Sequence, residues 1–190
     1  AGPRGLAAMP LARFDGRVWW LRPLLAVPRE RLAVYAAERG LANIDDESNA
    51  DPRYRRNALR ASVVPALRHI APGYPGGLLR AAELQAEAAA LLDDLARSDA
   101  HGACASAGLD RATLSRLDDA RARNVLRWYL RQRGLPAPSR ARLRAMASQL
   151  IGAAPDARVD IAHAGARIGV HCGRIVVHRP ASPAFEEQWD

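Results

Sequence analysis

The sequence predicts the remnant of an α/β domain, joined to a mostly helical domain that ends in a small C-terminal β-meander. Three observations predict this fold class. An Asp-Gly pair lies between apolar β-forming residues near the start, and a helical pattern follows it. Long Ala/Leu-rich and amphipathic stretches fill residues 77–151. Three short β-forming runs, separated by glycines, occupy residues 158–180.

The first elements form a strand–strand–helix unit, as in the closing part of an α/β sheet. Because the Asp-Gly pair at 15–16 favours a tight turn, we expect short strands at about 11–14 and 17–22. Pro28 then opens a helix, and Gly40 is its expected end. The apolar face of that helix is expected to hold Leu32, Tyr35 and Ala36.

The middle of the chain is expected to be helical, with interruptions. The pair at 51–52 predicts a helix start, because an aspartate cap precedes a proline at the first helical position. Pro65 should end or kink that helix. A breaker cluster at 71–77 predicts a domain boundary, a long helix is expected from 77 to 98, and residues 101–108 are expected to form a loop.

Two amphipathic helices are expected next, at 119–133 and 139–151. Gly134 and Gly152 are their expected stops, and Ser139 is the expected cap of the second. The tail predicts three strands whose turn glycines are Gly165 and Gly173. The predicted domains are residues 1–70, the α/β remnant; 71–98, a linker helix; 99–180, the helical domain; and 181–190, a tail.

The positive charge of this 190-residue chain is concentrated in one region. The net charge is +8, and all 28 basic residues are arginine. Residues 120–155 contain eight arginines and no acid. Because so concentrated a positive field favours a polyanion, the partner is predicted to be a nucleic acid, either RNA or DNA.

The cysteines and the hydropathy of the sequence indicate in which cellular compartment the protein is expected. Cys104 and Cys172 lack CxxC or paired His/Cys spacing, so neither a disulfide framework nor a zinc site is predicted, and a reducing cytoplasm is expected. No apolar run approaches ~18 residues, so no membrane span is predicted. The chain opens AGPRGL, without methionine or signal peptide, and is expected to be a piece of something longer.

The segment DDESNADPRYRRNALR, residues 45–60, sorts its acids ahead of its arginines. On a helical wheel Arg53, Arg56, Asn57 and Arg60 fall within one stripe. Like charges at these spacings repel, and three arrangements relieve that repulsion. The stripe is solvated, or the acids fold back and cap the helix, or the stripe holds an anion such as phosphate.

The order of residues in this segment is similar to a known signature. It resembles D-x-S-N-x-D-x-x-Y-x-R-N-x-x-R of the bacterial tRNA(Ile)-lysidine synthetases, members of the PP-loop ATP pyrophosphatase superfamily. Stretches 2–9, 22–25 and 63–67 resemble that family's flanking motifs, and 123–140 its substrate-binding domain. The matched signature positions are Asp46, Ser48, Asn49, Asp51, Tyr54, Arg56, Asn57 and Arg60.

This resemblance implies a reaction and its participants. The family joins the ε-amine of free lysine to C2 of the wobble cytidine in the CAU anticodon of tRNA(Ile). ATP first adenylates that cytidine, and lysine then displaces AMP. The resemblance therefore implies ATP and Mg²⁺ as cofactors and a Rossmann-like PP-loop fold for residues 1–70. It also implies a cytidine presented unstacked, as is usual for single-stranded RNA loops.

Two family motifs are missing from this sequence. The phosphate loop S-G-G-x-D-S and the H-x-A-D-D segment do not occur in the 190 residues. Without that glycine-rich loop there is nothing to cradle the ATP phosphates, so this chain alone is expected to be inactive although its parent is an enzyme. The family's last C-terminal domain is likewise expected to be absent after Asp190.

Residue roles follow from the resemblance with alternatives left open. Arg56, Asn57 and Arg60 either close the active-site cleft, meeting phosphate or the lysine carboxylate, or are purely structural. Gly2 and Gly5 are implied to line the nucleotide pocket, because glycines allow close backbone approach. Asp46, Ser48 and Asn49 are expected to be structural, and either Asp46 or Asp51 could hold the loop against the helix. No metal ligand is assigned.

A second basic surface is predicted on the helices at 119–133 and 139–151. Arg123, Arg127 and Arg131 form a stripe spaced four apart, beside an apolar face. It is either a solvated face or a contact for the tRNA backbone. Because residues 120–155 contain no acid to pair with these arginines, the tRNA contact is favoured. The next helix extends it through Arg140, Arg142 and Arg144. The predicted apolar face is Ala122, Val125, Leu126, Tyr129 and Leu130, with Trp128 outside it either packed on a neighbour or stacked on a base.

Two other functions remain compatible with the sequence. One is a non-catalytic basic module that binds nucleic acid, and the other is a helical scaffold for protein partners. Phosphate neutralisation gives binding a steep salt dependence, which a protein scaffold lacks. A homodimer is left open beside a monomer.

Overall fold

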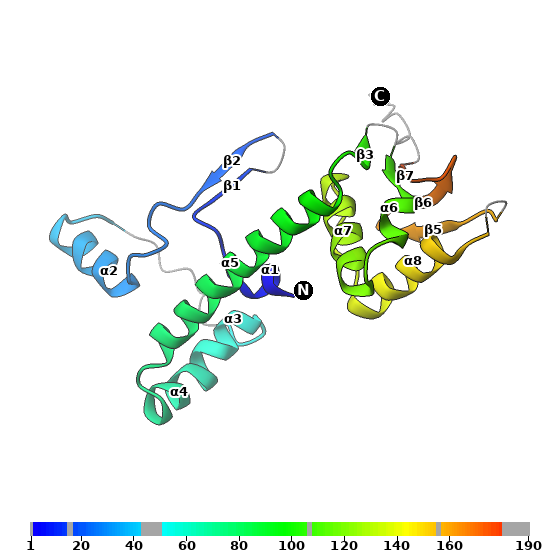
Figure 1. Ribbon diagram of the computed structural model, residues 1–190. Helices are drawn as coiled ribbons and strands as arrows, with labels where there is room; N and C mark the ends of the chain where they lie inside the picture. Colours follow the sequence, from blue (N-terminus) through cyan, green and yellow to red (C-terminus); the bar gives the residue numbers. More distant parts are fainter. Residues whose placement is uncertain (1, 15–16, 43–50, 106–107, 155–156, 180–190) are drawn as a thin grey trace, which may run out of the picture. The chain divides into compact units, whose positions relative to one another are not determined.

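The computed structural model describes residues 2–14, 17–42, 51–105, 108–154 and 157–179. The chain divides into two compact units, here called the N-terminal unit (residues 2–86) and the C-terminal unit (from residue 87 on). The long helix α5 (Tyr74–Asp99) contributes to both (Figure 1). The domain limits expected from the sequence stay predictions.

The N-terminal unit consists of short elements. Its strands β1 (Ala12–Phe14) and β2 (Trp19–Leu21) form an antiparallel pair in which Phe14 is opposite Trp19. The two rings lie 5.2 Å apart between centroids. This confirms the two expected strands, whereas the Asp-Gly pair at 15–16 lies outside the described residues. The helices are α1 (Pro3–Leu6), α2 (Arg29–Glu38), α3 (Arg55–Ala58) and α4 (Val64–Ile70), with a π-helical turn η2 (Leu59–Val63) between the last two.

The expected helix start at 51–52 is wrong. Helix α3 begins only at Arg55, because Asp51 uses its side chain and its carbonyl to hold a turn at residues 51–54. Pro65 does not end a helix either. It lies in the first turn of α4, which continues directly from η2, and the change from α-helix to π-helical turn occurs just before it. The expected kink stays a prediction.

No described residue of the N-terminal unit is buried. Trp19, Trp20 and Leu21 on β2 are 63%, 56% and 68% exposed. On α2, Tyr35 of the expected apolar face is also exposed. The elements of this unit are therefore supported mainly by local backbone hydrogen bonds and turns, and little by tertiary burial.

The C-terminal unit is a sheet with three helices packed on it and on one another. Helices α6 (Arg111–Ser115), α7 (Asp119–Gln132) and α8 (Arg140–Gly152) contact each other pairwise. Ser139 caps α8 as expected, by accepting from the Arg142 N–H. The strands are β3 (Cys104–Ala105), β4 (Gly108–Asp110), β5 (Asp160–His163), β6 (Ala166–His171) and β7 (Arg174–His178).

The sheet differs from the expected meander. Strands β5, β6 and β7 do form a meander, but the order β3-β4-β7-β6-β5 makes it part of a five-stranded antiparallel sheet. Residues 101–108, expected as a loop, contribute β3 and the start of β4. Leu109 of β4 lies opposite Ile175 of β7. A partner so distant in the sequence leaves no local periodic signal.

The two hairpin turns of the meander follow the sequence expectation. Gly165 and Gly173 have φ angles of 76° and 72°, and the residues before them, Ala164 and Cys172, are also left-handed at 50° and 47°. Positive φ at both central residues is the type I′ pattern that joins antiparallel strands directly. Glycine is needed at the second position of each turn because it adopts this conformation without steric cost.

The core of the C-terminal unit lies between α7, α8 and the sheet. The predicted apolar face of α7 is confirmed, since all five of its members are buried. Tyr129 donates its hydroxyl to the Ile175 carbonyl oxygen at 2.9 Å and so ties α7 to β7. Trp128 is partly buried against the same core, which confirms packing as its environment.

Candidate functional site

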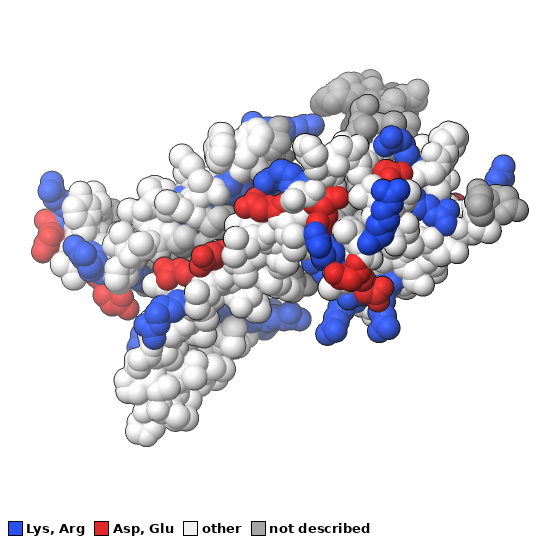
Figure 2. Space-filling model, in the orientation of Figure 1, with Lys and Arg blue, Asp and Glu red and all other residues white. Residues whose placement is uncertain are grey.

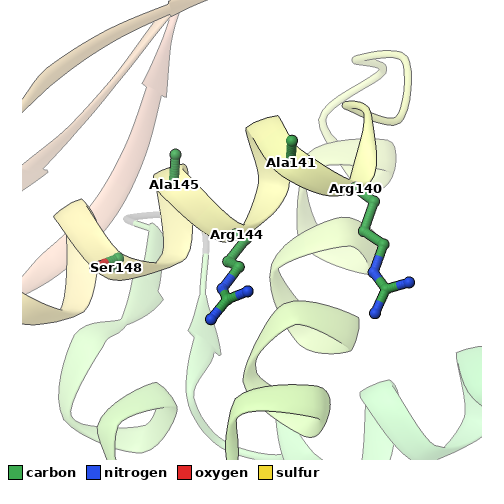
Figure 3. A pocket seen from close by; sticks show the side chains of 5 residues that line it. All are labelled: Arg140, Ala141, Arg144, Ala145 and Ser148. Carbon is green, nitrogen blue, oxygen red and sulfur yellow. The ribbon is translucent and has the colours of Figure 1, made fainter.

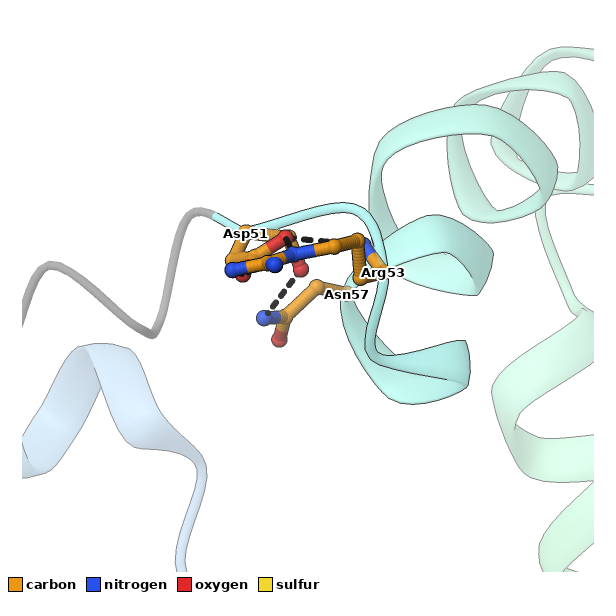
Figure 4. Close-up of polar contacts among 3 residues, drawn as sticks. All are labelled: Asp51, Arg53 and Asn57. Carbon is orange, nitrogen blue, oxygen red and sulfur yellow. Dashed lines mark hydrogen bonds and ion pairs between the residues drawn. The ribbon is translucent and has the colours of Figure 1, made fainter.

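The signature segment is organised around Asp51 (Figure 4). Its carboxylate accepts from the Arg53 N–H at 2.9 Å and forms an ion pair with the Arg53 guanidinium at 2.7 Å. The Asn57 amide nitrogen donates to the Asp51 carbonyl oxygen at 2.9 Å. Hydrogen bonding from Arg53 holds the pKa of Asp51 below its usual value. Asp51 thus holds the turn before α3 through Arg53 and contacts α3 itself through Asn57.

This turn corrects the predicted arginine stripe. Arg53 lies ahead of α3 and is paired with Asp51, so it does not share a helical face with the others. Arg56 and Arg60 are exposed, and their side chains make no ion pair or hydrogen bond with another described residue. The two guanidinium groups therefore remain available to an anion, whereas Asn57 already holds the turn. The acids at 45–50, expected to fold back on the helix, lie outside the described residues.

The segment that begins at Gly2 forms one tight helical turn. Gly2 has φ 67° and precedes α1, and its carbonyl accepts from the Gly5 N–H at 2.9 Å. A side chain at Gly2 would meet no atom within 4 Å, so open space lies beside this backbone. Among the described residues no group of three or more His, Cys, Asp or Glu side chains is placed to hold a metal ion.

The arginine stripe on α7 is partly neutralised, which corrects the premise that it lacks acids. Arg123 pairs with Asp119 at 3.2 Å, and Arg131 pairs with Asp93 of α5 at 2.6 Å. The pairing of Asp119 with Arg123 could be predicted from the sequence, because the two residues are four positions apart on one helix. Asp93 was not, because only the packing of α5 on α7 brings it near. On the face drawn in Figure 2, acidic and basic side chains lie next to one another.

Arg127, between these two, has no carboxylate partner among the described residues. Its guanidinium lies 3.4 Å from the side-chain oxygen of Asn124, whose amide donates to the Leu92 carbonyl at 2.6 Å. Burial lowers the pKa of Arg127, and the charges of Arg123 and Arg131 lower it further. Placing an anion beside it would relieve both effects.

On α8, Arg140 and Arg144 project from the same side of the helix (Figure 3). They border a shallow hollow with Ala141, Ala145 and Ser148. Both arginines are exposed, and their side chains make no ion pair or hydrogen bond within the described part of the chain. No carboxylate of a described residue therefore neutralises their charge.

A second, smaller hollow of about 350 Å³ lies between α7 and α8. Arg123 and Arg144 both line it, so the structure brings together one arginine from each of the two helices of the predicted basic surface. Ser148 also lines both hollows and was not predicted from the sequence, since a single serine on a helix gives no functional signal. Asp119 is the one acid at its rim among the residues that the structure describes.

Several other arginines of the C-terminal unit have structural roles. Their guanidinium groups donate to backbone carbonyls far away in the sequence. Arg111 reaches Ile151 at the C-terminal end of α8 at 2.8 Å, and Arg142 reaches Ala162 of β5 at 2.5 Å. Arg142, predicted to extend the basic surface, is thus engaged by the protein itself. The number of arginines in this unit is consequently larger than the number of arginines available to bind an anion.

No helix within the described ranges is both long and apolar enough to pass through a bilayer. Comparison with known protein families identifies two regions. Residues 1–67 match the PP-loop domain, and residues 109–176 match the TilS substrate binding domain. The first contains the Asp51 turn and α3, and the second contains α7 and α8 with their arginines.

Individual relatives extend across the boundary between these two regions. A tRNA(Ile)-lysidine synthase of Burkholderia pseudomallei is 46% identical over 176 residues, which is 90% of this chain and 36% of that protein. The enzymes of the same name from Chromobacterium violaceum and Alkalilimnicola ehrlichii are 48% identical over 72% of this chain and 39% identical over all of it. Those alignments cover 32% and 44% of the two relatives, so the chain spans roughly a third to somewhat under half the length of the relatives it matches. With both regions matched in order and relatives aligned over most of its length, the chain belongs to the tRNA(Ile)-lysidine synthase family.

Proposed function

We propose that this chain is part of a tRNA(Ile)-lysidine synthetase. That enzyme uses ATP to adenylate the wobble cytidine of a CAU anticodon and then joins free lysine to it, and it acts in the cytoplasm. The observation that carries the proposal is the presence of the PP-loop and TilS substrate binding regions in order on one chain. The relatives that align across both regions bear the name of this activity.

The N-terminal unit is proposed to be the end of a Rossmann-like PP-loop ATPase domain. Gly2 and Gly5 would lie beside the nucleotide, which is supported by the open space next to the Gly2 backbone. ATP with Mg²⁺ supplies the adenylyl group when bound. Because the S-G-G-x-D-S loop is not among these residues, the ATP chemistry is assigned to the whole enzyme and not to this chain.

Arg56 and Arg60 are proposed as the active-site residues of α3 and η2. Both guanidinium groups are exposed and unpaired with described residues, and a guanidinium makes strong two-pronged hydrogen bonds to phosphate or carboxylate. Asn57 positions them, because the hydrogen bond from its side-chain amide to the Asp51 carbonyl oxygen fixes where α3 begins. The anion is either a phosphate of the adenylated cytidine or the carboxylate of lysine.

The C-terminal unit is proposed to contact the tRNA backbone. The arginines in question are Arg123, Arg127, Arg131, Arg140 and Arg144, which lie on α7 and α8. Support comes from the desolvated, carboxylate-free Arg127 and from the exposed pair on α8. Phosphate contacts of this kind position a folded RNA without reading its sequence.

Lysidine formation by the full-length enzyme tests the proposal. The substrate is an unmodified tRNA(Ile) transcript with a CAU anticodon, supplied with ATP and radiolabelled lysine. Arg56→Ala should lower kcat/KM on the order of 10²-fold, as expected for removing a charged group that stabilises a transition state. The matched control is Arg55→Ala, an exposed neighbour on α3 that lies outside the signature.

Two results would contradict the proposal. Transcripts that take up no lysine with the unaltered enzyme would refute the activity itself. Equal rates for the Arg56 and Arg55 variants would refute the role of Arg56 and leave a structural role for the signature.

A further inference from the structure

The five arginines assigned to RNA contact are not equivalent, and the difference lies in their partners. Arg131 pairs with Asp93 at 2.6 Å, and both side chains are mostly buried. Arg123 pairs with Asp119 at 3.2 Å, and the Asp119 side chain is 89% exposed. Arg140 and Arg144 have no carboxylate within the described residues. The first pair is a fixed structural contact, whereas the second is an exposed contact of the kind that contributes little to stability.

The hollows connect the available groups. Arg140, Arg144 and Ser148 are spaced by four residues, so they follow one face of α8 at intervals of roughly 6 Å. The two alanines between them, Ala141 and Ala145, offer no hydrogen-bonding side chain. The second hollow shares Arg144 and Ser148 and extends to Arg123. The two hollows therefore have a common rim and lead from the exposed face of α8 to the start of α7.

We propose that these hollows form one binding track for the phosphodiester backbone of RNA, with Asp119 as a competing internal anion. Arg140, Arg144 and Ser148 hold phosphates directly, and Arg123 joins them when a phosphate replaces Asp119. The track rests on the proposed function, which it deepens by dividing the basic surface into contacting and self-neutralised arginines. Arg131 belongs to the second class and serves the packing of α5 on α7.

The exchange of partners at Arg123 follows from the chemistry of the two anions. The carboxylate of Asp119 meets a single nitrogen of Arg123 at 3.2 Å, which is long for a charge-assisted hydrogen bond. A phosphate in the hollow faces Arg123 and Arg144 together and accepts from both. Because a phosphodiester accepts hydrogen bonds from two guanidinium groups where Asp119 accepts from one, it displaces the acid. Asp119 thus weakens RNA binding.

Salt-dependent binding of a tRNA(Ile) transcript with a CAU anticodon tests the track. Fluorescence anisotropy of the labelled transcript gives Kd for the chain and its variants between low and moderate salt. The double variant Arg140→Ala/Arg144→Ala should bind at least tenfold more weakly, and the log–log slope should fall by about 1.4–1.8, because each of the two phosphate contacts contributes roughly 0.7–0.9 to it. Circular dichroism checks that the fold is kept, as expected for exposed positions.

The matched control removes the same charge elsewhere. Arg116 and Arg158 are exposed in the same unit and line neither hollow, and their side chains make no ion pair or hydrogen bond with other described residues. Arg116→Ala/Arg158→Ala should therefore change Kd by less than about twofold at moderate salt, where distant charges are screened. If both double variants lose affinity equally, net charge explains the binding and the track is refuted.

Asp119→Asn tests the competing anion. This variant should tighten RNA binding about two- to threefold, and the gain should vanish when Arg123 is alanine, because the two residues act as a pair. The matched control is Asp94→Asn, which removes an exposed acid paired with Arg97 on α5. An equal gain from both acid variants would overturn the role of Asp119.

The outcomes separate the two proposals. Normal tRNA binding without a specific loss at Arg140 and Arg144 refutes the track and leaves the proposed function standing. Absence of any tRNA binding by the unaltered chain refutes the track together with the RNA-contacting role of the C-terminal unit, while lysidine formation by the full-length enzyme still decides the activity.

Discussion

The two units of this chain contain similar local signals but differ in burial. Both have proline-initiated or capped helices and antiparallel strand pairs. In the C-terminal unit, Leu126 and Ile168 are completely buried, whereas in the N-terminal unit Trp19 and Leu84 are each 63% exposed. Local sequence signals thus specify secondary structure in both units, but only the C-terminal unit has a buried core among its described residues.

Hydrogen exchange should show the largest contrast. Amides of α7 and β6 should be protected up to the global stability of the C-terminal unit, while those of α2 should exchange after local opening. For a difference of about 5 kcal/mol the protection factors differ by on the order of 10³–10⁴. Exchange measured by NMR on the intact chain checks this. Similar protection in α2 and α7 would show that the N-terminal unit has a stability the exposed side chains do not explain.

Truncation of matched leucines should give the next largest effect. Leu126→Ala should destabilise the C-terminal unit by about 2–5 kcal/mol, because it leaves a cavity in a closed core. Leu84→Ala, at an exposed position of α5, should change stability by less than about 0.5 kcal/mol. Urea unfolding followed by circular dichroism measures both. Comparable losses would remove the basis for the contrast between the units.

A smaller effect is expected from the hydroxyl that links α7 to the sheet. Tyr129→Phe removes the hydrogen bond to the Ile175 carbonyl and should cost about 1–2 kcal/mol, since the hydroxyl is buried and the phenyl ring keeps the packing. Thermal unfolding of the two proteins at one pH gives the difference. A variant as stable as the parent would show that water replaces the tyrosine as donor.

The smallest effect concerns acid stability of the C-terminal unit. Hydrogen bonding from Thr113 holds the pKa of Asp110 below its usual value, and Asp110 caps α6. Its contribution, about 1 kcal/mol for a cap, is present above the unfolded pKa near 4 and is lost as pH falls through the lowered folded pKa. The stability gap between the parent and Asp110→Ala should therefore be constant from pH 7 to about 4 and shrink below. Urea midpoints across that range check it, and a gap that persists at pH 2 would contradict it.

Much of the secondary structure was predictable because its signals are local. The helical period of α7 identified five of its six buried residues, Ser139 marked the start of α8, and the glycines at 165 and 173 marked both hairpin turns. The signature at 46–60 likewise identified the family, which two matched regions and several relatives support.

What was missed depends on contacts between distant residues or on competing local bonds. The pairing of Leu109 with Ile175 and the neutralisation of Arg131 by Asp93 both need the folded unit before they exist. The late start of α3 has a local cause, because Asp51 used its carboxylate for a turn with Arg53 instead of a helix cap. Which arginines are open to a ligand could therefore not be read from charge alone.

Strand β7 is the last described strand in the chain but lies in the middle of its sheet, between β4 and β6. During synthesis, β4 and the hydroxyl of Tyr129 must therefore wait until residues 174–178 have left the ribosome. Until then the apolar faces of α7 and α8 lack the side chains of β7, such as Ile175, that help to bury them. A nascent chain paused before Arg174 should for this reason be held by chaperones or degraded, so the C-terminal unit can complete its fold only after that last strand has been made.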